Sequence, residues 1–114
     1  MKIGELIPCP VKFETFKRNR ERYIPGKPGC YVLTNFSRDV LYIGLTVSLR
    51  RRIIEHLDNP EKTSETRTGR AVLFFWIEVP ESEINKIERT WLNIHIQHEG
   101  VVPTLNKMYS PVSA

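Results

Sequence analysis

The sequence has little cysteine, no long apolar run and no tract of repeated composition. Its two cysteines, Cys9 and Cys30, are too few for a disulfide framework, and neither belongs to the Cys-x-x-Cys pairs typical of zinc sites. No apolar stretch reaches the roughly 20 residues that span a bilayer, and the N-terminus lacks the apolar core of a signal peptide. These absences argue against disulfide-rich and membrane-spanning classes. At 114 residues, the sequence predicts one cytoplasmic domain with a modest core.

The charge balance is mildly basic, with 17 Lys and Arg against 13 Asp and Glu and a formal net charge of +4. This excess is compatible with a polyanionic partner such as DNA but does not diagnose one. The basic residues gather in an N-terminal cluster (Lys12, Lys17, Arg18, Arg20, Arg22 and Lys27) and in the run Arg50-Arg51-Arg52. Such clusters could hold phosphates and make binding salt-dependent. A solvated charged surface explains the N-terminal cluster equally well.

Two β-prone runs, residues 31–33 and 40–43, flank a segment rich in turn formers and predict an antiparallel hairpin. If the turn closes around Phe36 and Ser37, Tyr31 and Tyr42 lie opposite each other on one face. A slip of one residue would send them to opposite faces. Residues 72–79 are predicted to add a third strand. We therefore expect an α/β (α+β) domain with a central, mainly antiparallel three-stranded sheet flanked by helices.

Two helices are clear from the pattern. The first has Thr46 or Ser48 as its N-cap and runs to about Leu57. Arg52 and His56, four residues apart, lie on one edge of its apolar stripe and can reach the hairpin tyrosines.

The second helix starts near Glu81 or Ser82 and ends before Gly100. Glu88 falls on its apolar side, where a carboxylate loses hydration and needs a cation, an arginine or an open cleft. An ion pair with Arg52 and a metal site are both open at this point. His95 and His98 also lie near that face, but His95 is two turns from Glu88, so we expect hydrogen-bonded core or interface histidines.

Two segments have weaker patterns. Residues 12–23 could form a basic helix, which Pro25-Gly26-Lys27-Pro28 would end. Residues 58–69 contain only polar residues, Pro and Gly, which predicts a mobile loop.

The ordered set of polar residues resembles the GIY-YIG nuclease superfamily. The family pattern corresponds here to Gly29-Cys30-Tyr31, a ten-residue spacer, Tyr42-Ile43-Gly44, Arg52, His56, Glu88 and the stretch Pro103-Thr104-Leu105-Asn106. The resemblance covers residues 28–107. It leaves residues 1–27 as a basic N-terminal extension and residues 108–114 as a C-terminal tail.

This resemblance implies a metal-dependent DNA endonuclease that hydrolyses phosphodiester bonds with a single Mg²⁺ or Mn²⁺ ion. Glu88 would hold the metal, and Arg52 would contact the phosphate and follow the charge of the transition state. Tyr31 would be the base, if a nearby cation lowers its pKa. Tyr42 would hydrogen-bond the phosphate or Tyr31, and His56 would orient water or relay the proton. Gly44 would let the backbone approach the substrate, and Asn106 would tie the C-terminal segment to the site.

Two departures limit what the resemblance implies. Leu45 stands where relatives often have a lysine, so Lys27 or Arg50 would have to supply that charge at the substrate. The second DNA-binding domain that many relatives append has no counterpart in the sequence. Specificity is then low, or a partner protein or a homodimer supplies it. A nucleic-acid-binding module with a weak or inactive nuclease site is the alternative. Repair, restriction and mobile-element roles are all compatible with the pattern.

Overall fold

A computed structural model describes residues 1–108 of the chain. Its strands are β1 (Lys12–Thr15), β2 (Gly29–Thr34), β3 (Val40–Thr46) and β4 (Leu73–Glu78). Its α-helices are α1 (Leu49–Leu57), α2 (Pro60–Thr63) and α3 (Ile84–Glu99). Four short 3₁₀ helices complete it: η1 (Ile3–Glu5), η2 (Glu21–Tyr23), η3 (Glu81–Glu83) and η4 (Thr104–Met108).

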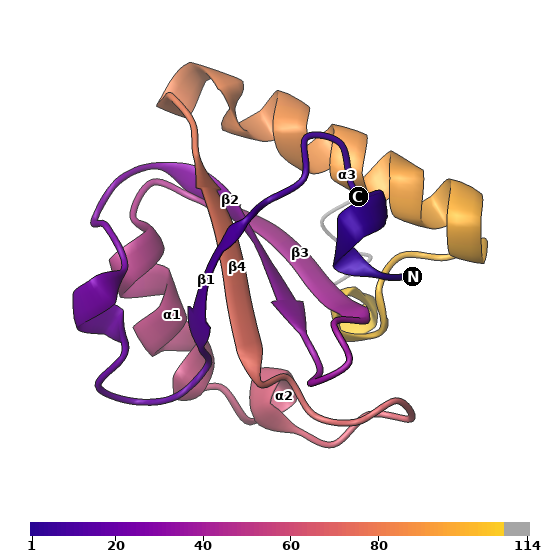
Figure 1. Cartoon of the computed structure of the whole chain (residues 1–114), viewed down its shortest axis with the longest axis horizontal. Helices are drawn as coiled ribbons and strands as arrows, with labels where there is room; N and C mark the ends of the chain where they lie inside the picture. Colours follow the sequence, from indigo (N-terminus) through magenta and orange to yellow (C-terminus); the bar gives the residue numbers. More distant parts are fainter. Residues whose placement is uncertain (109–114) are drawn as a thin grey trace.

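The four strands form one antiparallel sheet in the order β1-β4-β2-β3 (Figure 1). The prediction of three strands is therefore wrong by one, and residues 12–15 are a strand rather than part of a basic helix. Phe13 of β1 lies opposite Phe75 of β4, with ring centroids 4.9 Å apart. Because β1 is an edge strand, its charged side chains stay hydrated, so a basic pattern fits an edge strand as well as a helix.

The β2–β3 hairpin forms as predicted, but with a different register. Tyr31 lies opposite Gly44, and Leu33 lies opposite Tyr42. The register shifts after Leu33, where Leu41 is an extra residue in β3, as in a β-bulge. The tyrosines are thus diagonal neighbours rather than a direct pair. They share one face of the sheet, with ring centroids 5.9 Å apart.

Each face of the sheet carries a hydrophobic core. Along β2, Tyr31 and Leu33 point to the core shared with α1, and Cys30 and Val32 point to the core shared with α3. Alternate residues of a strand point to opposite faces, so a β2 with both faces covered is completely buried. Trp91 of α3 is fully buried in the second core.

The predicted helix bounds are close to those observed. Ser48 caps α1, and its hydroxyl group accepts a hydrogen bond of 3.3 Å from the amide of Arg51. Gly100 ends α3 with φ of 80°, a left-handed conformation that favours glycine. Residues 58–69, predicted to be a mobile loop, include the short helix α2, which is capped by Asn59.

Residues 1–27 are built into the domain. The Val40 amide donates to the carbonyl oxygen of Met1 at 2.8 Å, and Trp91 Nε1 donates to the carbonyl oxygen of Pro8 at 2.9 Å. Phe16 and Ile24 are buried in the core beneath α1. No helix in the described part of the chain is long and apolar enough to cross a membrane.

Candidate active site

A pocket of about 410 Å³ opens at the β3 edge of the sheet. It is lined by Tyr31, Tyr42, Gly44, Leu45, Arg52, Asn85 and Glu88. Arg52 comes from α1, on one face of the sheet, and Glu88 comes from α3, on the other. Because no strand within residues 1–108 lies beyond β3, residues from both faces can meet around its edge.

The position of the Tyr31 hydroxyl group in this pocket depends on Gly44. A Cβ atom at position 44 would lie 2.5 Å from the hydroxyl oxygen of Tyr31 and 2.8 Å from a ring carbon of Tyr42. Such distances are too short for any side chain. The absence of a side chain on this strand residue therefore lets the Tyr31 hydroxyl group reach the pocket. The expected role of Gly44 was close approach to substrate, whereas the structure shows close approach to the tyrosines.

Tyr31 and His56 form a buried pair. The Tyr31 hydroxyl oxygen is 2.6 Å from Nε2 of His56. Burial raises the pKa of Tyr31 well above its usual value, with a further rise from Tyr42 and an opposing effect of Arg52. Burial, followed by the charges of Arg52 and Lys62, lowers the pKa of His56 to about 3. Both groups are therefore neutral at pH 7, and the phenol can donate a hydrogen bond to the imidazole nitrogen.

Arg52 is held on the rim of the pocket by its own helix. One terminal nitrogen forms a 3.0 Å ion pair with Glu55. Its Nε is buried and has no hydrogen-bond partner among residues 1–108. A buried N–H group without a partner is costly, so Arg52 has donor capacity left for a ligand.

Glu88 is half-buried beneath the same pocket, and its burial raises the pKa of the carboxyl group, with Arg89 opposing the shift. The part of the chain that is described offers its carboxylate no ion pair. Arg52 pairs with Glu55 instead, so the alternative of a Glu88–Arg52 ion pair has no support. No cluster of three or more His, Cys, Asp and Glu suited to a metal occurs within residues 1–108. A metal here would have Glu88 as its carboxylate ligand.

Asn106 secures the open edge of the sheet. Its side-chain amide accepts from the Ile43 amide at 2.9 Å and donates to the Ile43 carbonyl at 3.0 Å. Both hydrogen bonds are to β3, the strand that carries Tyr42 and Gly44. The predicted tie between the C-terminal segment and the site therefore exists as two hydrogen bonds to the backbone.

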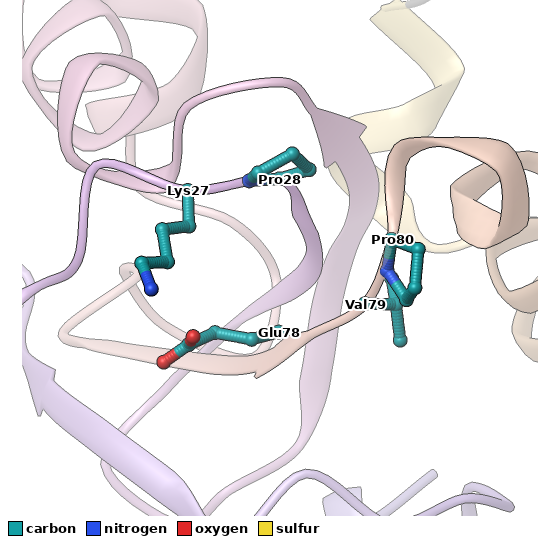
Figure 2. Close-up of a pocket in the computed structure, with 5 residues that line it drawn as sticks. All are labelled: Lys27, Pro28, Glu78, Val79 and Pro80. Atoms are coloured by element: carbon teal, nitrogen blue, oxygen red, sulfur yellow. The ribbon is translucent and has the colours of Figure 1, made fainter.

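Lys27 and Arg50 lie outside this pocket. Arg50 donates from Nε to the carbonyl oxygen of Ile24 at 2.8 Å. Lys27 lines a separate pocket of about 280 Å³ with Pro28, Glu78 and Pro80. Figure 2 shows its side chain pointing toward Glu78. Neither residue stands where the missing lysine at position 45 would place its charge.

The histidines of α3 serve the fold. His95 is buried, and its Nδ1 is 2.7 Å from the carbonyl oxygen of Val101. His98 is partly exposed and lies 3.2 Å from Glu5. His95 is the hydrogen-bonded core histidine expected from the sequence, whereas His98 lies on the surface.

Sequence reasoning missed two residues near the site. Asn85 lines the pocket one helical turn before Glu88. Lys62 of α2 is buried, with its ammonium group 4.7 Å from the centre of the Tyr42 ring. The turn spacing from Glu88 could have indicated Asn85. Nothing in the polar segment around Lys62 could have indicated burial.

The family model of the GIY-YIG catalytic domain matches residues 27–99. The chain belongs to the GIY-YIG family. The predicted membership and the enzyme class, an endonuclease acting on phosphodiester bonds, are confirmed. UvrABC system protein C of Mesoplasma florum is 26% identical over 94 residues, and that of Mycoplasma mycoides is 27% identical over 88. These matches cover 81% and 75% of this chain but only 16% and 15% of the two relatives.

A solved structure supports the fold of this GIY-YIG domain. It is the GIY-YIG N-terminal endonuclease domain of UvrC from Thermotoga maritima, a point mutant bound to its catalytic divalent cation. The likeness has a TM-score of 0.52 with 22% identity and covers 79% of this chain and 98% of that one. It confirms the α+β class with an antiparallel sheet.

Proposed function

We propose that the chain is a divalent-metal-dependent DNA endonuclease that hydrolyses phosphodiester bonds. One observation carries the proposal: the Tyr31–His56 pair, Arg52 and Glu88 come from both faces of the sheet and converge on one pocket. Family membership gives the reaction class, and the UvrC relatives make DNA the first substrate to test.

The residues present fit a divalent cation. Glu88 offers a half-buried carboxylate that forms no ion pair within residues 1–108, although the charge of Arg89 lowers its pKa. The pocket of about 410 Å³ has room for an ion that keeps most of its water ligands, as Mg²⁺ does when proteins supply few carboxylates. When bound, the ion would relieve charge on the phosphate and the leaving oxygen. The UvrC domain of similar fold holds a catalytic divalent cation, so Mg²⁺ and Mn²⁺ are the first ions to test.

The other side chains would handle charge and protons. Arg52, whose side chain is 37% exposed, would bind a nonbridging phosphate oxygen through its terminal nitrogens as negative charge develops. Tyr31, once ionised, would take a proton from the attacking water, with the neutral His56 ring 2.6 Å away to orient its hydroxyl oxygen. Burial raises the pKa of Tyr31 and opposes this ionisation, whereas the charge of Arg52 and a bound cation would favour it. Tyr42 would hydrogen-bond the phosphate.

A binding module with a weak or inactive site is the second candidate. Leu45 in the pocket lining and the high pKa of Tyr31 favour it, because both lower reactivity at neutral pH. The UvrC relatives point to a role in DNA repair. A partner protein or a second copy of the chain would then supply specificity.

The two candidates differ in one assay. Purified protein is incubated with supercoiled, branched and single-stranded DNA, with Mg²⁺, with Mn²⁺ and with neither. We expect nicked or shortened DNA only in the presence of metal. Binding to DNA without cleavage under any of these conditions would favour the binding module.

A further inference from the structure

Lys62 is a buried lysine without an ion pair among residues 1–108, although the charge of Glu61 raises its pKa. It is 7% exposed, and no carboxylate of the described chain forms an ion pair with it. Burying an ammonium group without compensation costs free energy, so such lysines are uncommon where only stability matters. The cost is visible in the pKa of Lys62, which burial lowers.

The nearest partners of Lys62 belong to the site. Its ammonium nitrogen is 4.7 Å from the centre of the Tyr42 ring, a distance typical of a cation–π contact. The Tyr42 ring meets the His56 ring edge-on at 5.2 Å between centroids and lies 5.9 Å from the ring of Tyr31. Lys62 therefore touches one end of a packed ring cluster whose other end carries the Tyr31–His56 hydrogen bond.

The backbone fixes where Lys62 points. Asn59 accepts a hydrogen bond of 2.9 Å from the Glu61 amide, and Pro60 occupies the first turn of α2. The helix packs against α1 and η4. The cap and this packing orient α2 so that the side chain of Lys62 points into the interior, although the surrounding segment is polar.

We infer that Lys62 is a positioning residue of the nuclease site, whose ammonium group holds the Tyr42 ring in place and keeps a fixed positive charge beside His56. The inference rests on the proposed function, because it assigns Lys62 a part in the same reaction. The titratable and charged groups that face His56 are Tyr31 from β2, Tyr42 from β3, Arg52 from α1 and Lys62 from α2. The two cations among them disfavour an imidazolium ion, so His56 stays neutral and keeps its hydrogen bond with Tyr31.

Three variants test this role. Lys62→Met keeps the length of the side chain and removes the charge, and Lys62→Arg keeps the charge. Lys86→Met removes an exposed lysine of α3 as a matched control. Melting temperature, DNA binding, cleavage against pH and the titration of the His56 ring by NMR without DNA are measured for each.

For Lys62→Met we expect an equal or higher melting temperature, because an uncompensated buried charge is lost. Cleavage should fall about tenfold at unchanged DNA affinity, a modest share of what proton-transfer groups contribute. The pKa of His56 should rise. Lys62→Arg should restore most of the cleavage, and Lys86→Met should behave as wild type.

Full cleavage by Lys62→Met with an unchanged His56 titration would overturn the inference. A lower melting temperature that Lys62→Arg does not restore, with His56 unaffected, would overturn it too, because Lys62 would then serve only the fold. The NMR titration needs no substrate. If the wild type cuts no DNA, the proposed function fails, while an unchanged His56 titration separately refutes the role of Lys62.

Discussion

The two edges of the sheet differ in whether their charged groups form ion pairs. At the β1 edge, three basic residues are paired within the protein: Arg20 with Glu14 at 2.9 Å, Lys12 with Glu78 at 3.9 Å, and Arg18 with Asp58. At the β3 edge, the Glu88 carboxylate has no ion pair within residues 1–108, and Nε of Arg52 has no acceptor there. Strands β1 and β3 are the two outer strands of the sheet (Figure 1).

This difference separates charge that serves the fold from charge that is available for chemistry. Exposed ion pairs such as those at the β1 edge contribute little stability, but they satisfy the charges involved. Half-buried charged groups without partners lower the stability of the folded protein. Such groups are typical of functional sites, where a ligand can pair with them. The excess of basic residues near the N-terminus, which suggested a phosphate-binding surface, is therefore weaker evidence than the few unpaired groups at β3.

The largest effect is expected for Glu88→Gln. Cleavage should fall about a thousandfold, because the amide cannot hold the cation as the carboxylate does. Burial raises the pKa of Glu88, so the ionised form costs stability at pH 7, and the variant should melt at an equal or higher temperature. Glu14→Gln at the other edge is the control and should keep full cleavage in a plasmid assay. Normal cleavage by Glu88→Gln would refute the proposed metal site.

Next in size is Tyr31→Phe, which keeps the ring and leaves His56 without its 2.6 Å partner. Cleavage should fall by several hundredfold, within the range for groups that transfer protons. In the wild type, cleavage should rise steadily with pH, because burial raises the pKa of Tyr31 well above its usual value and little phenolate exists at pH 7.

Tyr23→Phe, on exposed η2, should match wild type in rate and pH profile. If Tyr31→Phe keeps both the rate and the alkaline rise, another group is the base, and His56 becomes the first candidate.

Arg52→Ala should lower turnover about a hundredfold with a smaller change in DNA affinity, since the contact is strongest in the transition state. Arg51 is the matched control on the same helix, with its side chain 61% exposed and paired with Glu55. Arg51→Ala should be nearly as active as wild type in single-turnover kinetics. The reverse result would mean that the phosphate lies along the outer face of α1.

The sequence could predict the site residues better than their surroundings. Periodicity and spacing placed Arg52 and His56 on one helix edge and Glu88 on the apolar side of α3, because these relations are local. The register of the hairpin depends on an extra residue at Leu41, which no local pattern reveals. Strand β1 and the buried Lys62 were missed for a similar reason, since both owe their state to packing against distant segments.

The smallest effect is expected at the β1 side of the domain. Deleting residues 1–24 would not test DNA binding, because Phe16 and Ile24 belong to the core and the deletion would unfold the protein.

The double variant Lys17→Gln and Arg22→Gln instead removes two exposed charges that form no ion pair with an acidic residue of the described chain. Each phosphate contact contributes about 0.9 to the slope of log affinity against log salt. If these residues face away from the bound DNA, the slope measured by fluorescence anisotropy should stay within error of wild type. A slope lower by about two would show that both edges of the sheet contact DNA. The N-terminal cluster would then be part of the binding surface after all.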